Sequence, residues 1–307
     1  MFFTVLKSNI NINMKGGLKW NLMELNKDKC EYPNPLKLKS YKSKYFVIPS
    51  PVILLNTLNH KRVSIFSYLS IKKGLDNNLI LKMSYILDWL NKKEDRHKNG
   101  INEKIIECIE YFCDMGYLKL FDTFNNTNLL ECCFNSEKLT EDCQNGLFRF
   151  AIIYLDEVNT ILNYRSNDTT INSDIVLLVF AYLRMKIYRR PNKLDITDIN
   201  LDNKNSHSYD IKKRRERAIE AYDCYYYEIA EELGITERVV SKVINILYGL
   251  NLIYFESLPK TKYDDKWKTN HTIFCNTYKR ENGYLLAEGK EYYLPEIDNK
   301  KKKLHIK

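Results

Sequence analysis

The side chains best suited to recognition chemistry lie within ten residues, from 236 to 245. Arginine and asparagine can form paired hydrogen bonds with the edges of guanine and adenine, and serine, threonine and lysine can contact bases or phosphates. Residues of these types stand here at five positions: Thr236, Arg238, Ser241, Lys242 and Asn245. On a helix that begins near Thr236 they lie on the outward side. The pattern therefore predicts contact with nucleic acid.

Two helices and a tight turn must position these side chains, and the segment Tyr227–Val243 has the residues for both. Ala230 is small where the first helix crosses the second, and Gly234 occupies the turn, where a positive φ favours glycine. The apolar positions that we expect between the helices are Leu233, Ile235, Val240 and Val243. The segment resembles the helix-turn-helix of bacterial DNA-binding proteins, which implies that the second helix reads duplex DNA.

The chain also contains an internal repeat. Residues 65–73 align with residues 179–187 at an offset of 114, with Phe, Tyr, Leu and one Lys coinciding. Each segment follows a strand-like stretch, 45–48 or 150–153, and a short helix-like one, 54–56 or 161–163. The sequence thus predicts that one arrangement of elements occurs twice.

A second match aligns residues 102–109 with residues 236–243 at an offset of 134 and continues to Leu118 against Leu252. Apolar residues recur at i, i+1, i+4, i+7 and i+8, which predicts one buried helix face. Asn102 and Thr236 stand where N-caps belong. A short strand follows each helix, at 117–121 and 252–255, and a return strand at 271–275 completes the second hairpin. Because the offsets differ, the second copy carries a net insertion of 20 residues.

Three helices and a hairpin, occurring twice, predict a mainly α protein with small β wings: an α+β fold of two tandem winged-helix domains. We place the first domain at 45–145 and the second at 146–295, with a basic insertion at 188–212. A basic N-terminal arm (1–44) and a basic, disordered tail (296–307) flank them.

The formal net charge of +9 is concentrated outside the two expected domain bodies. Residues 1–44 hold nine Lys and three acids, residues 184–217 hold eleven Lys or Arg and five acids, and the tail from Lys300 holds five Lys. Charge segregated into arms and loops predicts a polyanionic partner. The alternative is an ordinary solvated surface of a Lys-rich protein. The further DNA-contact candidates are Lys260, Lys262, Lys266 and Lys268 in the wing, and Arg189, Arg190, Lys212, Lys213, Arg214 and Arg215 at the insertion.

The first copy differs at the equivalent surface. An acidic stripe at i, i+4, i+7 and i+11 consists of Glu103, Glu107, Glu110 and Asp114, and it would repel phosphate. Basic residues stand just before it: Lys92, Lys93, Arg96 and Lys98. We expect this copy to bind phosphates obliquely, to dimerise or to dock a partner; a merely solvated acidic face is the alternative.

Catalytic signatures are absent from the sequence, which has no G-x-x-x-x-G-K-[ST], H-E-x-x-H or G-x-S-x-G motif. His207 has no neighbouring His for a paired metal site, and Asp156 and Glu157 fit a helix start, where acids favour the dipole. The eight cysteines form no C-x-x-C pair, and the spacing of Cys113, Cys132, Cys133 and Cys143 fits no known zinc module. We therefore expect no enzyme, cofactor or metal.

A membrane location is also not expected. The longest apolar run, Ile175–Leu183, has nine residues, whereas a membrane span needs about 20. The N-terminus lacks the apolar block of a signal peptide. We expect a cytoplasmic protein.

The arrangement over residues 45–280 resembles the plasmid and phage replication initiators of low-GC Gram-positive bacteria. The resemblance is most specific at the second helix-turn-helix and the repeated Phe-x-Tyr-Leu helix. It implies binding of duplex DNA at repeated origin sites and recruitment of replisome proteins, with a homodimer as a further candidate assembly. A transcriptional regulator of a mobile element and a winged-helix docking scaffold of the replisome are the alternatives.

Overall fold

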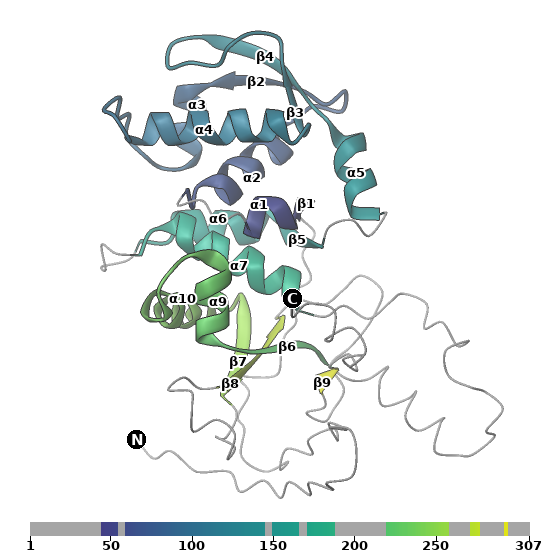
Figure 1. Ribbon diagram of the computed structural model, residues 1–307, viewed down its shortest axis with the longest axis vertical. Helices are drawn as coiled ribbons and strands as arrows, with labels where there is room; N and C mark the ends of the chain where they lie inside the picture. The colour runs from purple at the N-terminus through teal and green to yellow at the C-terminus, as the bar shows by residue number, and fades with distance from the viewer. Residues whose placement is uncertain are drawn as a thin grey trace, which may run out of the picture. The chain divides into compact units, whose positions relative to one another are not determined.

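The computed structural model describes residues 44–54, 59–144, 149–165, 171–187, 219–257, 271–276 and 292–293. Within these residues nine helices and nine strands form an α+β fold (Figure 1). The chain divides into two compact units. The larger unit comprises Tyr41–Lys186 and Asp223–Phe274, and the smaller one comprises Met1–Ser40, Ile187–Tyr222 and Cys275–Lys307. Nearly all of the described elements belong to the larger unit.

The first half of the larger unit contains four strands and four helices, followed by a fifth helix. In chain order they are β1 (Tyr45–Pro49), α1 (Ser50–Leu54), α2 (Arg62–Lys72), β2 (Asn78–Lys82), α3 (Met83–Trp89), α4 (Ile101–Asp114), β3 (Leu118–Leu120), β4 (Leu129–Phe134) and α5 (Ser136–Gln144). An antiparallel sheet has the order β2-β4-β3, so the last strand lies in the middle.

The remaining elements repeat this order. They are β5 (Phe150–Tyr154), α6 (Leu155–Asn163), α7 (Ser173–Lys186), β6 (Ile219–Tyr225), α9 (Tyr226–Leu233), α10 (Glu237–Gly249), β7 (Ile253–Ser257), β8 (His271–Asn276) and β9 (Tyr292–Tyr293). Their sheet has the order β7-β8-β6-β9, and β9 pairs with β6 in parallel. Strand, helix, helix, strand, helix, helix, strand, strand thus occurs twice.

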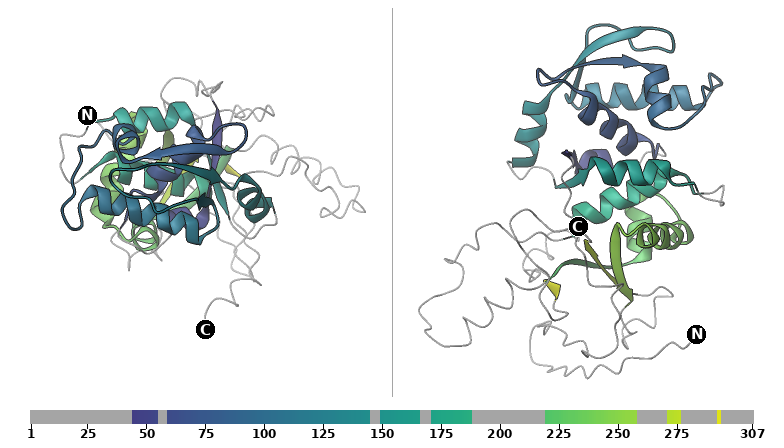
Figure 2. Two further views of the ribbon diagram at one scale, coloured as in Figure 1. Left: turned by 90° about the horizontal axis from the view of Figure 1, so that it is seen from above. Right: turned by 180° about the vertical axis from the view of Figure 1, so that it is seen from behind.

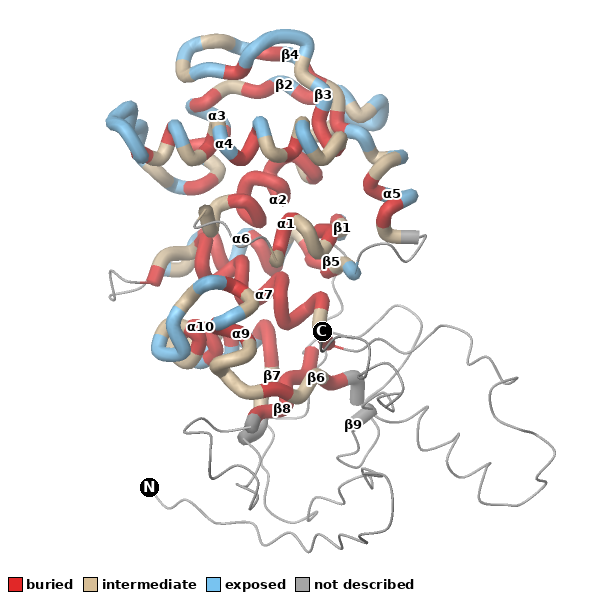
Figure 3. The backbone as a smooth tube through the Cα atoms, in the orientation of Figure 1, coloured by how far each residue is buried: buried red, intermediate tan, exposed pale blue. Residues whose placement is uncertain are grey.

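The two halves meet along their first elements. Strands β1 and β5 pair antiparallel, from Tyr45 opposite Tyr154 to Pro49 opposite Phe150. Helix α2 packs against α7, and both are buried over most of their length (Figure 3). A helix that is buried on all sides lies in a core. The Phe-x-Tyr-Leu repeat therefore predicts the two central helices correctly, and the halves share one core.

Aromatic packing joins α2 to the rest of the first half. The Phe66 ring makes edge contacts with Phe112 of α4 at 5.2 Å, with Tyr117 at 5.8 Å and with Phe134 of β4 at 5.7 Å. Such pairs add to the stabilisation that apolar burial gives. They hold α4 and the sheet on the central helix.

Strands β2, β6 and β9 were not expected from the sequence, and the return strand β4 was expected only as part of a hairpin without residue bounds. In chain order, β2 lies between α2 and α3, and β6 lies between α7 and α9. In β2 the buried Leu79 and Leu81 alternate with Asn78, Ile80 and Lys82, which is the pattern of a half-buried strand. Among the described helices, none has the combined length and apolar composition of a bilayer crossing.

Candidate nucleic-acid interface

A short turn joins α9 to α10. Helix α9 begins after β6, where the Glu228 carboxylate accepts a hydrogen bond from the Tyr225 N–H at 2.8 Å. It ends at Gly234, whose φ of 65° lies in the left-handed region, and the Ile235 N–H donates to the Ala230 carbonyl at 3.0 Å. The prediction of a positive φ at Gly234 is confirmed.

Helix α10 begins at the predicted N-cap. The Thr236 hydroxyl accepts a hydrogen bond from the Val239 N–H at 3.4 Å, so one of the four unpaired N–H groups of the first turn is satisfied. The connection between α9 and α10 is therefore only residues 234–236, which fixes the direction of α10 closely.

Replacing Gly234 with Ala tests this turn. A Cβ at Gly234 would meet nothing within 4 Å, so the cost should come only from the positive φ, at about 1 kcal/mol. Gly249 is the matched control, because a Cβ there also meets nothing within 4 Å but the residue lies in α10 without a positive φ. Gly249→Ala should stabilise the helix by up to about 1 kcal/mol. Urea unfolding measures the change in the free energy of unfolding for both variants. If both variants were stabilised, or both destabilised, this account of the turn would be contradicted.

The packing of α10 decides which of its residues face outward. Its buried positions are Val240, Val243, Ile244 and Leu247, and α9 contributes Ile229, Ala230 and Leu233. Ile235, predicted in this core, is half-buried. The core residues recur at helical spacing, so the opposite side of α10 is left to polar residues.

The predicted recognition residues share that opposite side. Arg238, Ser241, Lys242 and Asn245 stand at i, i+3, i+4 and i+7, which places them on one helix face. Thr236, Arg238 and Asn245 are exposed, and Ser241 and Lys242 are half-buried. The Asn245 amide nitrogen donates to the Ser241 carbonyl of its own helix at 2.9 Å. The structure thus brings four of the predicted residues onto one face of α10, and the fifth, Thr236, lies at the N-cap of this helix.

The remaining predicted contact residues lie outside the described part of the chain. These are Lys260, Lys262, Lys266 and Lys268 of the wing, and Arg189, Arg190, Lys212, Lys213, Arg214 and Arg215 of the insertion. Both predicted wing strands are present as β7 and β8, which neighbour each other in the sheet. At the base of the wing, Tyr248 of α10 packs against Phe255 of β7 with ring centroids 5.4 Å apart.

Helix α4 is the counterpart of α10. The sequence offset between their equivalent positions is one residue larger than the sequence comparison predicts. Its buried positions are Ile105, Cys108, Ile109 and Phe112, each 135 residues before a buried position of α10. The turns after the helices agree: the Tyr117 N–H bonds the Phe112 carbonyl and the Leu252 N–H bonds the Leu247 carbonyl, both at 2.9 Å. The expected offset of 134 is therefore wrong.

With this register, the outward faces differ in charge at equivalent positions. Glu103 corresponds to Arg238, Glu107 to Lys242, and Glu110 to Asn245. Glu103, Glu107, Glu110 and Asp114 are all exposed, as the acidic stripe predicts. One fold element thus presents a polar, cationic surface in one half and an anionic surface in the other.

Asn102 is not the N-cap that the sequence predicts. The N-cap of α4 is Gly100, and Asn102 lies inside the helix with its side chain buried. Its side-chain oxygen accepts from the Asp95 N–H at 3.1 Å, and its amide nitrogen donates to Asn126 at 2.8 Å. Asn102 therefore connects the α3–α4 loop to the β3–β4 loop through hydrogen bonds. The sequence carries no local signal for this tertiary role.

Two cations of the basic segment 184–217 are paired within the fold, Arg184 in the core and Lys186 at a half-buried position. Arg184 is 1% exposed, and its guanidinium lies 2.7 Å from the Glu157 carboxylate. Lys186 forms an ion pair with Glu232 at 2.7 Å. These charges hold helices together and offer little to a polyanion. Glu157 also accepts from the Tyr154 N–H at 2.9 Å, which agrees with its expected place at a helix start.

The described cysteines behave as packing residues. No two of them are joined by a disulfide. Burial raises the pKa of Cys108 to about 12 and the pKa of Cys132 to about 12, so both thiols stay protonated at neutral pH. Within the described ranges, no group of three His, Cys, Asp or Glu side chains could hold a metal ion.

The chain matches no protein-family model and no curated protein. Any functional proposal therefore depends on the sequence pattern and the geometry of this chain.

Proposed function

We propose that this protein binds duplex DNA in a sequence-specific manner, with α10 as the helix that enters the major groove. The observation that carries the proposal is the outward face of α10. Arg238 and Asn245 are residues that can read base edges, and Ser241 and Lys242 can contact bases or phosphates. The three-residue turn and the Thr236 cap hold this face at a fixed angle to α9.

The proposal includes a tandem winged-helix architecture, and the repeated order of elements supports it. In a winged helix a strand follows the first helix, and the hairpin after the third helix adds two more strands. Here the final strand of each hairpin, β4 or β8, lies between the other two, in the orders β2-β4-β3 and β6-β8-β7. Two halves with the same order of elements and the same order of strands favour one common fold.

Only one of the two halves is proposed to read a groove. Four exposed carboxylates on α4 would face phosphates at close range if that helix entered a groove, and like charges repel. The equivalent face of α10 carries two cations and no carboxylate at these positions. The sequence specificity is therefore assigned to α10.

The process that we propose is initiation of replication of a plasmid, phage or integrative element. The support is the resemblance of the repeated arrangement and of the helix-turn-helix to replication initiators. A plasmid that carries the selected binding sites and has no other origin should replicate only when this protein is supplied. Loss of replication with intact DNA binding would favour the transcriptional alternative.

Selection of binding sites from random duplexes tests the DNA proposal directly. An enriched sequence should emerge, and if about six phosphates are neutralised, affinity should fall by roughly 10³ between 50 and 200 mM salt. Titrations at several salt concentrations give this slope. Weak binding without an enriched sequence would contradict the assignment of α10.

A further inference from the structure

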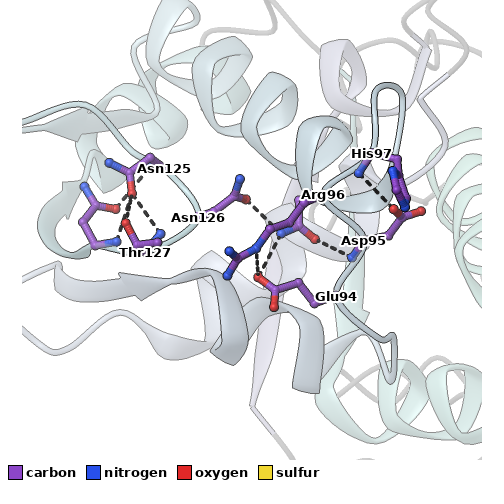
Figure 4. A network of polar contacts seen from close by, with 9 residues as sticks. Glu94, Asp95, Arg96, His97, Asn125, Asn126 and Thr127 are labelled. Carbon is purple, nitrogen blue, oxygen red and sulfur yellow. Dashed lines mark hydrogen bonds and ion pairs between the residues drawn. The ribbon is translucent and has the colours of Figure 1, made fainter.

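The loop between α3 and α4, residues 90–100, is tied down by hydrogen bonds (Figure 4). The Asn102 side chain accepts a hydrogen bond from the Asp95 N–H. It also donates one to the side chain of Asn126, which lies in the β3–β4 loop. The Gly100 N–H donates to the His97 carbonyl at 2.8 Å. A Cβ at Gly100 would lie 2.6 Å from the Asp95 carbonyl oxygen, so only glycine fits this close approach. The loop therefore presents its side chains from a defined backbone.

The two acids of this loop are used within it. Glu94 pairs with Arg96 at 2.8 Å, and the Asp95 carboxylate accepts from the His97 N–H at 3.0 Å. The side chains of Lys92, Lys93 and Lys98 have no hydrogen bond or ion pair with any described residue. Lys93 and Lys98 are exposed and Lys92 is half-buried. The ammonium groups of these three lysines are thus available to bind an external anion.

We propose that this loop, residues 92–98, is a second DNA-contact site that binds backbone phosphates while α4 stays out of the groove. The proposal rests on the proposed function of α10. The loop projects to the left in Figure 1, the side on which α10 lies, and both accordingly lie on the right in the rear view of Figure 2. One duplex can then meet α10 through its bases and the loop through its backbone.

The composition of the loop favours a phosphate backbone over an acidic protein partner. Protein interfaces depend on buried aromatic or aliphatic anchors, and residues 92–99 contain no apolar side chain. Lysine is a flexible point charge that serves phosphate contact without reading sequence. The acidic stripe begins on α4 directly after the loop. The lysines of the loop would therefore attract the DNA backbone, and the carboxylates of α4 would repel it.

The triple variant Lys92→Gln/Lys93→Gln/Lys98→Gln tests the site. The salt slope should fall by about 0.9 for each phosphate that the variant no longer neutralises, which corresponds to about eightfold weaker binding per phosphate at about 0.1 M salt. Cognate and random duplexes should weaken by the same factor, because phosphate contacts carry no sequence information. Fluorescence anisotropy with both duplexes at several salt concentrations measures this.

The control is Lys72→Gln/Lys119→Gln/Arg149→Gln, which removes the same charge from exposed basic residues outside both the loop and the N-terminal arm. It should change the salt slope by less than about 0.5, because none of these three residues is proposed to meet a phosphate. Gly100→Ala keeps every charge but disturbs the loop, and it should lower the slope as well. Thermal unfolding of each variant checks that the fold is retained.

The outcomes separate this inference from the proposed function. If the unaltered protein binds no duplex specifically, the assignment of α10 fails. If it binds specifically but the triple variant keeps the full slope, the loop site alone is wrong. Loss confined to the cognate duplex would mean that the loop reads bases. An unchanged DNA affinity with loss of a co-purifying acidic protein would make the loop a protein-docking site; either result overturns the proposal.

Discussion

The variant Arg238→Glu/Asn245→Glu should reduce binding to the cognate duplex to the level of binding to random DNA. Both residues are exposed on α10, and the new side chains reproduce the acids Glu103 and Glu110 at the equivalent positions of α4. Removing one specific base contact costs about 1–3 kcal/mol. Removing two and adding repulsion should therefore weaken cognate binding by at least about 100-fold. Fluorescence anisotropy with the selected duplex measures this change.

The mirror variant Glu107→Lys/Glu110→Asn gives α4 the residues that α10 has at the equivalent positions, Lys242 and Asn245. It changes the net charge by the same amount in the opposite direction, and binding to the cognate duplex should stay equal or become tighter. A larger loss from this variant than from the α10 variant would mean that the reading helix has been assigned to the wrong half.

A third variant separates local chemistry from net charge. Lys72→Glu/Asn159→Glu lowers the net charge as much as the α10 variant does, at exposed positions of α2 and α6. Only the modest effect of a distant, screened charge is expected. Specificity lost to a similar extent in this variant would show that overall charge, and not the face of α10, determines binding.

Local sequence patterns were sufficient to predict much of the geometry of the candidate interface. Gly234 and Thr236 are recognisable because a left-handed turn and a helix N-cap each demand particular residue types. The outward face of α10 follows from the spacing of its apolar residues. These features depend on residues within a few positions of one another, so one sequence is enough to predict them.

The register between α4 and α10 shows where such patterns become ambiguous. Each helix has apolar residues beside its buried stripe, Ile106 and Cys113 in α4 and Val239 and Ile246 in α10. A gapless comparison can match these flanking residues to the core residues and shift the register by one. Only the observed burial and the turn at Gly116 and Asn251, both with positive φ, decide between the two registers.

Features that depend on distant residues were missed. Strand β2 is defined by its pairing with β4, some 50 residues later in the chain. Asn102 resembles a cap in the sequence, but its partners include Asn126 in another loop. The sequence places Arg184 among the surface cations because charged residues are almost never fully buried unless they are paired, and its partner Glu157 lies on another helix.

The buried pair of Glu157 and Arg184 should have the largest effect on stability. Both side chains are 0% exposed, and their charged atoms lie 2.7 Å apart. Glu157→Gln removes the anion beside a guanidinium that stays in the core and stacks on Phe180 at 4.7 Å. Breaking such a pair costs about 3–5 kcal/mol, because a buried charge is left without compensation. Urea unfolding followed by circular dichroism measures the loss.

The double variant Glu157→Gln/Arg184→Met distinguishes a charge effect from damaged packing. Replacing both ions removes the uncompensated charge, so the double variant should be more stable than Glu157→Gln alone. Arg96→Met supplies the surface comparison, since the Arg96–Glu94 pair is 59% and 46% exposed and should be worth less than about 1 kcal/mol. If the losses measured for Glu157→Gln and for Arg184→Met alone add up to the loss of the double variant, the pair does not couple α6 to α7. The packing of α6 on α7 would then depend on the apolar contacts between these helices, and the charge would be incidental.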